Sequence, residues 1–279
     1  MELRTLTWNL FHGRDAPPEK QLLTWRSRLL RSTLRSEAHA QVNRDLYDSF
    51  ASTLGDADWD LALLQECPPR WAERLAVECR AEPHLVLTSR NLPHLGRLQA
   101  IAAALNPDLI ASWEGGCNLT LVRGRVDRPS ITERRELEIT DRPERRAMAF
   151  SRLATGVCVA NVHASAPHEL AERDVQLAAG VAHEWAAGAP LLFGGDLNIR
   201  PSRSRFVFNA LARDHGLAAP TNEDAIDHLL VRGLEVVTAP SQWAPQRRDV
   251  PDPTATGDEE ALPVRLSDHA PVEALFAQT

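Results

Sequence analysis

Two polar residues follow an apolar run in the stretch LLFGGDLNIRPS, residues 191–202. Asp196 and Asn198 lie two positions apart, directly after Gly194 and Gly195. In a strand-like continuation, residues two apart point to the same side. A carboxylate can take a proton from water, and an amide can orient that water or a phosphate oxygen. This pair alone is as consistent with a helix or turn cap as with a catalytic site.

Five other short stretches place polar residues at the margin of an apolar run. They are LTWNLFHG with Asn9, LLQE with Glu66, NVHAS with His163, AIDHLLV with Asp227, and LSDHAPV with Asp268 and His269. One such case means little, because strand ends are routinely polar. Together, however, the stretches supply two histidines and several oxygen ligands, which is the material of a phosphate or metal site.

The motifs WNL, LLQE, NVH, GGDLN, IDHLLV and SDHAPV occur in this order between residues 8 and 272. This set resembles the endonuclease/exonuclease/phosphatase superfamily of metal-dependent phosphoesterases. The pair GDLN and SDH is fairly specific, whereas either motif alone is weak. The resemblance covers nearly the whole chain. It implies an α/β fold of the deoxyribonuclease I-like type, a four-layer α/β/β/α sandwich with two stacked mixed sheets and a site at one edge.

The resemblance also implies a metal site. Asn9, Glu66 and Asp268 correspond to its residues, and Glu66 is the main ligand. Mg²⁺ prefers hard oxygen ligands and keeps several waters, so one or two carboxylates suffice. We therefore expect Mg²⁺ as the cofactor, with Mn²⁺ able to replace it. Phe11 stands where some members carry a further Asp, so a modest metal affinity is expected.

The remaining roles concern the reaction itself. The resemblance implies that Asp196 and Asn198 position and activate the attacking water, and that His269 contacts the scissile phosphate. Asp227 would hold the His269 ring and raise its pKa, as a neighbouring carboxylate does. His163 would be the second histidine, near the leaving group.

Structural interpretations remain open for several of these residues. Asn9 could cap a turn, His163 could be a structural histidine at a strand end, and Asp227 could pair with an arginine. His12 is expected to be structural, and His228 to face the other side of its strand from Asp227. Asn118 resembles a position near the phosphate only weakly.

The bulk properties of the chain fit one α/β domain over residues 1–279. Nine strands are predicted, over 2–11, 58–66, 84–89, 117–124, 145–153, 156–165, 190–196, 225–233 and 269–277. They interleave with helical patterns over 19–36, 42–54, 69–79 and 168–187. Residues 239–263 contain five prolines and are expected to form a long surface loop. The segment 14–55 is longer than a minimal member needs and could extend a substrate cleft.

The cysteines and the termini bear on location. Four cysteines occur without a CxxC pair, so we expect buried, reduced thiols. The N-terminus has no signal-peptide pattern, and no run approaches the roughly 18 apolar residues of a membrane span. A cytoplasmic protein is therefore expected.

The charge of the chain bears on the substrate. The net charge is −7, and the acidic stretch GDEE precedes the SDH motif. A duplex is bound largely by releasing its counterions, so bulk duplex DNA is not favoured, although Arg26, Arg28, Arg31 and Arg35 could form a basic wall. The expected substrate is a phosphate mono- or diester. A nuclease and a catalytically silent binding module on the same scaffold remain as alternatives.

Overall fold

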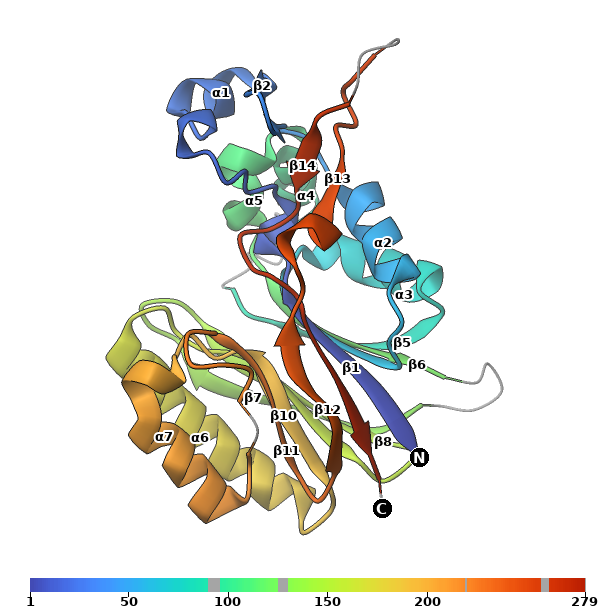
Figure 1. The fold of residues 1–279 in the computed structure, drawn as a ribbon, viewed down its shortest axis with the longest axis vertical. Coiled ribbons are helices and arrows are strands. Elements are labelled where there is room, and N and C mark those ends of the chain that lie inside the picture. Colours follow the sequence, from blue (N-terminus) through green and yellow to red (C-terminus); the bar gives the residue numbers. More distant parts are fainter. Residues whose placement is uncertain (90–95, 125–129, 219, 257–260, 279) are drawn as a thin grey trace.

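The structure is a computed structural model that describes residues 1–89, 96–124, 130–218, 220–256 and 261–278. Two large mixed sheets stack face to face, with helices on both outer surfaces (Figure 1). This arrangement confirms the predicted four-layer sandwich. The assignment of all 279 residues to one domain stays a prediction.

The first sheet has six strands in the order β12-β15-β1-β4-β6-β5. Its strands are β1 (Glu2–Asn9), β4 (Leu61–Cys67), β5 (Ala81–Leu87), β6 (Cys117–Arg123), β12 (Glu235–Gln242) and β15 (Val272–Ala277). β1 and β4 are parallel neighbours, so their carboxyl ends, with Asn9 and Glu66, meet at one edge of the sheet.

The second sheet has five strands in the order β11-β10-β9-β8-β7. They are β7 (Ile131–Thr140), β8 (Arg146–Leu153), β9 (Cys158–His163), β10 (Leu191–Asp196) and β11 (Asp227–Arg232). β9 and β10 are parallel, and β11 runs antiparallel to β10. The ends of β9 and β10 and the start of β11 therefore share one edge.

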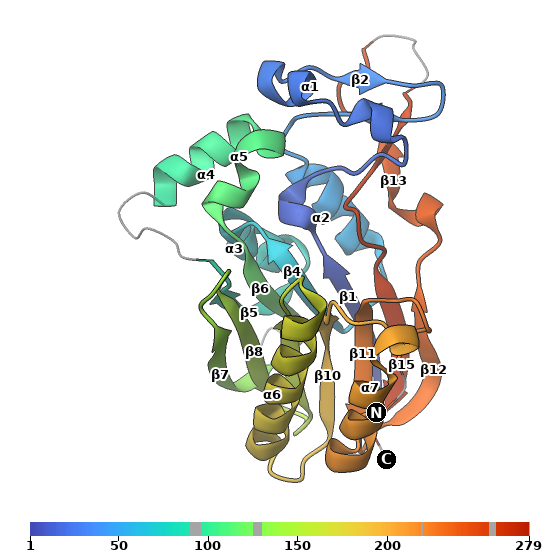
Figure 2. The same ribbon diagram turned by 90° about the vertical axis from the view of Figure 1, so that its left-hand side faces the viewer.

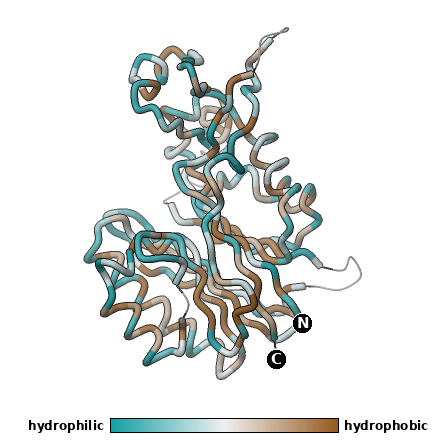
Figure 3. The backbone as a smooth tube through the Cα atoms, in the orientation of Figure 1, coloured by the Kyte–Doolittle hydropathy of each residue, from teal (hydrophilic) through white to brown (hydrophobic). Residues whose placement is uncertain are grey.

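Each sheet is covered by a pair of helices (Figures 1 and 2). The pairs are α2 (Tyr47–Asp56) with α3 (Ala72–Glu78), and α6 (His168–Ala186) with α7 (Pro201–His215). α2 and α3 bury Phe50, Leu54 and Leu75 against the first sheet. α6 turns a face of alanines to the second sheet, which lets the helix approach the strands closely. A third apolar layer, with Leu63, Leu192 and Phe276 among its members, fills the space between the sheets. The apolar colour of Figure 3 is accordingly concentrated on the strands.

Beyond the site edge of the sheets lie several shorter elements (Figure 2). The helices are α1 (Trp25–Leu30), α4 (Gly96–Leu105) and α5 (Pro107–Glu114). Two small hairpins are formed by β2 (Leu34–Arg35) with β3 (Ala40–Gln41), and by β13 (Asp249–Pro251) with β14 (Pro263–Arg265). Short 3₁₀ helices occupy Phe11–Gly13, Lys20–Leu22, Pro69–Trp71 and Pro245–Arg248.

Two sequence predictions need correction here. The helix expected over 19–36 is instead a 3₁₀ turn, the short α1 and the strand β2. The long loop expected over 239–263 contains the end of β12, a 3₁₀ turn, β13 and the start of β14. Prolines are tolerated there because these strands lie at sheet edges, where a missing N–H breaks no ladder. The whole of GDEE, residues 257–260, lies outside the described residues.

The cysteines and the membrane prediction have clear outcomes. All four cysteines are free and buried, as predicted. Among the described residues, no helix combines the length and the apolar character that crossing a membrane requires.

Candidate active site

Three of the predicted site residues lie side by side at the edge of the second sheet. Asp196, the last residue of β10, is the register partner of His163 at the end of β9 and of Asp227 at the start of β11. Strand pairing alone therefore brings together residues from three distant stretches of the chain. All three side chains are buried.

Gly195 explains why a double glycine precedes Asp196. Its φ of +129° is rarely adopted by other residues, and a Cβ there would lie 2.0 Å from the carbonyl oxygen of Val162. Only glycine fits where β10 approaches β9 this closely. The glycine thus brings Asp196 and His163 to adjacent positions at the sheet edge.

The Asp196 carboxylate is held by two donors and bordered by two histidines. Asn9 donates from Nδ2 to Oδ2 at 3.0 Å, and the backbone N–H of Asn198 donates to Oδ1 at 3.1 Å. The Nε2 atoms of His163 and His269 lie 3.4 Å and 3.9 Å from Oδ2. Burial raises the pKa of Asp196 to about 7, although the charge of His269 opposes the shift. A carboxylate of this kind can gain or lose a proton near neutral pH.

Asp227 and His269 form the predicted pair across 42 positions of sequence. His269 Nδ1 lies 2.8 Å from Asp227 Oδ2, which confirms the predicted hydrogen bond and excludes the alternative of an arginine partner for that oxygen. Burial opposes a charged ring, but Asp227 and then Asp196 raise the pKa of His269 well above its ordinary value. These two carboxylates therefore favour the charged, imidazolium form of His269.

The loop that carries His269 is fixed from several sides. Ser267 has a φ of +59°, donates from Oγ to the carbonyl oxygen of Asn9 at 2.6 Å and accepts from the N–H of His269 at 3.0 Å. Trp8 and Arg248 both donate to the carbonyl oxygen of His269, at 3.1 Å and 3.0 Å. These contacts explain why the histidine stays in place although it lies outside any strand.

Glu66 stands on the first sheet, opposite this group. Its φ of +46° turns the chain at the end of β4, and its side chain is 21% exposed. The carboxylate has His12 Nε2 at 3.3 Å and His163 Nε2 at 3.8 Å. His163 thus lies within 4 Å of both Glu66 and Asp196 and connects the two sheets.

The donor set fits a hard divalent cation. Glu66 is electrostatically coupled to Asp196 and Asp268, since its charge raises the pKa of each. Three oxygen-bearing carboxyl groups that repel one another, with no thiolate among them, form a set suited to Mg²⁺ or Mn²⁺. A cation there would offset the repulsion.

A second possible metal cluster needs separate mention. One ligand atom from each of Asp196, Asp227 and His269 lies within 4.8 Å of the others. However, Asp227 and His269 already share a short hydrogen bond, and a protonated His269 cannot ligate a metal. The Glu66 side is therefore the better candidate.

The structure brings all eight predicted residues to this edge, with two refinements. The Oδ1 of Asn9 accepts the N–H of Phe11 at 2.9 Å, so its amide nitrogen faces Asp196. This geometry favours orienting Asp196 over ligating a metal. His163 is 2% exposed and burial lowers its pKa well below the ordinary value, which favours a neutral ring behind Asp196.

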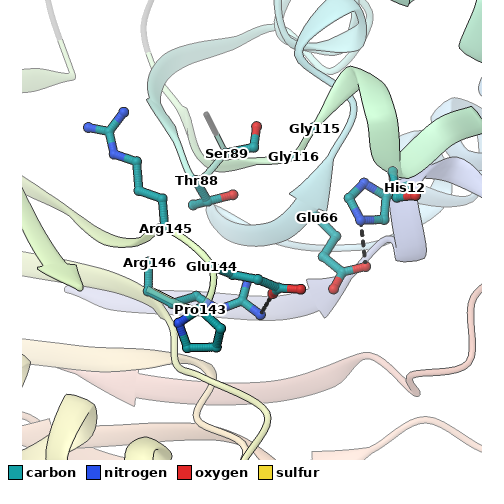
Figure 4. A pocket seen from close by; sticks show the side chains of 11 residues that line it. His12, Glu66, Thr88, Ser89, Gly115, Gly116, Pro143, Glu144, Arg145 and Arg146 are labelled. Carbon is teal, nitrogen blue, oxygen red and sulfur yellow. Dashed lines mark hydrogen bonds and ion pairs between the residues drawn. The ribbon is translucent and has the colours of Figure 1, made fainter. Parts of the chain in front are cut away.

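His12 and Arg146 were not predicted as site residues. His12 contacts Glu66. His12, Glu66 and Arg146 all line a pocket of about 310 Å³ beside the candidate metal site (Figure 4). Burial lowers the pKa of His12, with Glu66 opposing the shift. The signal in the sequence was its position three residues after Asn9, in the turn that leaves β1. For Arg146, at the start of β8, the sequence carried no comparable signal.

Asn118 and His228 have structural environments. Asn118 is buried and donates from Nδ2 to the carbonyl oxygens of Ala147 and Asn161, at 2.7 Å and 3.3 Å. His228 is buried against Phe208 and accepts the N–H of Thr221 at 3.1 Å. Neither side chain is directed at Asp196 or Glu66 by these contacts.

A buried polar layer lies behind the site, between the sheets. Gln65, next to Glu66, donates from Nε2 to Asn161 Oδ1 at 2.8 Å and to Thr7 Oγ1 at 3.1 Å. Asn161 on β9 in turn donates to the carbonyl oxygen of Leu64 at 3.3 Å. These bonds join β4 of one sheet to β9 of the other.

Comparison with solved structures supports the assignment of the fold. A family protein from Bacteroides thetaiotaomicron, described only as endonuclease/exonuclease/phosphatase, matches with a TM-score of 0.64 and 15% identity, over 100% of this chain and 98% of its own. A mannosyl-6-phosphatase from the same species matches with a TM-score of 0.62 and 14% identity, over 99% of each chain. TDP2 from Caenorhabditis elegans, in truncated form, matches with a TM-score of 0.56 and 14% identity, over 99% of this chain and 97% of its own.

A comparison with curated proteins found no match for the chain. A comparison with models of protein families found one. The model of the "Endonuclease/Exonuclease/phosphatase family" matches residues 6–269, a span that contains the whole constellation from Asn9 to His269. The fold is therefore that of phosphoesterases, and this protein belongs to the endonuclease/exonuclease/phosphatase family.

Proposed function

We propose that this protein hydrolyses a phosphate mono- or diester with the help of Mg²⁺, which Mn²⁺ can replace. The observation that carries the proposal is the series of contacts from Asp227 through His269 to Asp196, beside Glu66. These contacts support a proton acceptor, a cationic donor and a metal-binding carboxylate at one site. Positive charge and hydrogen-bond donors assist hydrolysis of a phosphate ester, because phosphate repels anionic nucleophiles.

Asp196 is the proton acceptor in this proposal. Its pKa of about 7 lies near the working pH, where a general base is most effective. Asn9 and the backbone of Asn198 fix its two oxygens, so one orientation is maintained. The Asn198 side chain is anchored on the carbonyl oxygen of Ala164 at 3.0 Å, which leaves its own oxygen to orient the water.

His269 is the cationic donor. Asp227 engages Nδ1, so Nε2–H is directed away from Asp227 and toward the side of Asp196. A fixed imidazolium can donate to a phosphoryl oxygen and stabilise the charge that develops in the transition state. His163, as a neutral ring between Asp196 and Glu66, keeps the two carboxylates apart. Its expected place near the leaving group stays a prediction.

Glu66 and Asp268 would hold the cation. When bound, Mg²⁺ polarises a phosphoryl oxygen and stabilises the leaving oxygen. Asn9, predicted as a third ligand, contributes by orienting Asp196 in this proposal. The partial exposure of Glu66 leaves room for the waters that Mg²⁺ retains.

The pocket beside Glu66 supports a small polar substrate. Its described lining includes the hydroxyls of Thr88 and Ser112, the backbone of Gly115 and Gly116, and Arg145. Apart from His12, the lining side chains that the structure describes include no aromatic ring on which a nucleobase could stack. With a net charge of −7, the chain is also a poor general partner for duplex DNA, so we propose that bulk duplex is not the substrate.

The experiment compares small phosphoesters with supercoiled plasmid, in Mg²⁺ and in EDTA, at about 0.15 M salt. We expect EDTA-sensitive turnover of at least one small ester and slow plasmid relaxation. Rapid, sequence-independent relaxation without small-ester turnover would make the protein a nuclease. Binding of phosphoesters without any turnover would support the silent binding module instead.

A further inference from the structure

The helices beyond the site edge have an unusual distribution of side chains. More than half of the exposed large apolar side chains in the described residues lie in residues 23–30 and 98–113, on α1, α4 and α5. The most exposed include Trp25 at 75%, Leu30 at 61% and Leu98 at 62%. In Figure 3 the α1 segment accordingly carries both the apolar and the hydrophilic colours.

The same helices bury small or polar residues. Ser27 of α1 is 1% exposed, Gln99 of α4 is 3% exposed, and α5 buries Ala111 and Glu114. This is the reverse of an ordinary surface helix, which turns its apolar stripe inward. Clustered exposed apolar residues of this kind mark interaction sites, whereas single ones need no explanation.

Hydrogen bonds and a shared hollow connect the three helices. Asn43 and Asn106 both donate to the carbonyl oxygen of Arg28 in α1, at 2.9 Å and 2.8 Å, which fixes α1 to the junction of α4 and α5. Leu30 of α1 and Ala104 of α4 line the same hollow. We name the exposed apolar surface of these helices the lobe face and define it by Trp25, Leu29, Leu30, Leu98, Ile101 and Trp113.

The charge on and around the lobe face is basic. Residues 20–31 contain Lys20, Arg26, Arg28 and Arg31 and no acidic residue. Arg26, Arg31 and Arg44 have no ion pair with any described residue. Arg31 and Arg44 line the hollow with Asp45, whose carboxylate is already paired with Arg70 at 3.2 Å.

We propose that the lobe face docks on an anionic lipid bilayer. Trp and Leu side chains mixed with unpaired arginines are the composition that binds at the interface of such a membrane. A second copy of the chain fits less well, because a symmetric contact would bring the same unpaired arginines together. Nucleic acid also fits less well, because four of the six side chains that define the lobe face are leucine or isoleucine and offer no ring for stacking.

Membrane docking does not depend on hydrolysis. An active enzyme could therefore fail to dock, and an inactive protein could still dock. α5 does connect the two regions, since Trp113 belongs to the lobe face and Ser112 lines the pocket beside Glu66. Docking by this face would therefore hold the pocket near the lipid surface.

The test is flotation of the full chain with phosphatidylcholine vesicles, with and without about 30% phosphatidylserine. This fraction gives the strongly negative surface that attracts basic residues. We expect flotation with the anionic vesicles and little with neutral ones. The variant W25S/L29S/L30S should lower the apparent partition coefficient at least roughly tenfold. R26Q/R31Q should lower it roughly fivefold for each arginine removed.

Matched controls lie on the opposite helices. L177S/F206S replaces exposed apolar residues of α6 and α7, and R203Q/R205Q replaces exposed arginines of α7, so both should bind as the parent does. Thermal unfolding checks each fold, and R26Q/R31Q keeps the test valid if the apolar variant unfolds. Absence of flotation, or unchanged flotation of both lobe variants, would overturn the proposal. A dimer that W25S/L29S/L30S dissociates would assign the face to a second copy instead.

Discussion

The two halves of the candidate site are held in different ways. On the second sheet, the Asp196 side chain is 2% exposed and two N–H donors fix its oxygens. On the first sheet, the Glu66 side chain is 21% exposed, and the imidazoles of His12 and His163 are the basic groups within 4 Å of its carboxylate in the described part of the chain. The difference suits a rigid proton acceptor on one side and an open carboxylate that completes its surroundings with a hydrated cation on the other.

The largest expected effect comes from Asp196→Asn. The variant keeps the shape and the contact with Asn9 but removes the proton acceptor, so kcat should fall by roughly 10²–10⁴-fold. Steady-state kinetics and circular dichroism measure activity and fold. Asp224→Asn, at an exposed position nearby in sequence, is the matched control and should retain activity. Near-normal turnover of the Asp196 variant would return GGDLN to a structural role.

Glu66→Gln should weaken the binding of the cation rather than impair proton transfer. Losing the charge of the main ligand should weaken Mg²⁺ binding at least roughly tenfold, by calorimetric titration. Glu73→Gln, on the exposed side of α3, should bind Mg²⁺ as the parent does. An unchanged affinity for the Glu66 variant would remove this residue from the metal site.

The pH dependence of the activity should reflect the protonation of Asp196. As pH falls through about 7, Asp196 takes up a proton and can no longer act as a base, so activity should fall by up to roughly tenfold per pH unit. A bound cation favours the ionised carboxylate, so this acid limb should move to lower pH as Mg²⁺ is raised. A limb that neither lies near neutrality nor moves with Mg²⁺ would argue against Asp196 as the base.

Asp227→Asn should change a pKa more than the fold. Because Asp227 helps to raise the pKa of His269, its neutral replacement should lower that pKa. The alkaline limb of the pH–rate profile should then move to lower pH. NMR titration of labelled histidine measures the pKa directly, with Asp224→Asn as the control. An unshifted His269 signal would show that Asp227 only positions the ring.

A third buried carboxylate, outside both halves, sharpens the comparison. Burial and then Asp108 raise the pKa of Asp15 to about 8, with no histidine to oppose them. The folded state therefore holds a proton that the unfolded state has lost, so this group's stabilising contribution decreases as pH rises from about 4 to 8.

Asp15→Asn mimics the protonated form and should remove this pH dependence. Between pH 5 and 8 the free energy of unfolding of the parent should fall by about 1–3 kcal/mol relative to that of the variant, as measured by denaturant unfolding. Asp48→Asn, whose side chain is 98% exposed, should run parallel to the parent. If the free energy of unfolding of the Asp15 variant also changes with pH as that of the parent does, the pKa of Asp15 in the parent lies near its ordinary value.

The sequence predicted the strands that carry the site better than the elements around it. β4, β9 and β10 are largely apolar and buried on both sides, β1 is buried from Thr5 onward, and the polar ends of these strands mark the site directly. β7 and β12 were missed because most of their residues are exposed and polar or charged, as suits edge strands. α7 was missed because it buries few large apolar residues, and α4 and α5 because their apolar residues face outward.

Within the site, Glu66, Asp196 and Asp227 were found because each lies at one end of a buried strand. The Asp227–His269 bond was predicted from the chemistry of a charged histidine and is confirmed at 2.8 Å. The contact of His12 with Glu66 was missed, because it depends on a turn with φ of +54° at His12 and +46° at Glu66. Such backbone conformations leave no pattern in a hydrophobic periodicity.

The bonds of Gln65 and Asn161 have a consequence for how such a site can change over time. Glu66 and Asp196, the proposed metal ligand and base, belong to different sheets, and sheets that touch only through apolar side chains can slide when the core is repacked. Here a slide of one residue would leave buried amides without partners, at a cost of about 1–3 kcal/mol for each. Substitutions in the apolar layer between the sheets would therefore leave the distance between Glu66 and Asp196 fixed as long as the bonds of Gln65 and Asn161 persist.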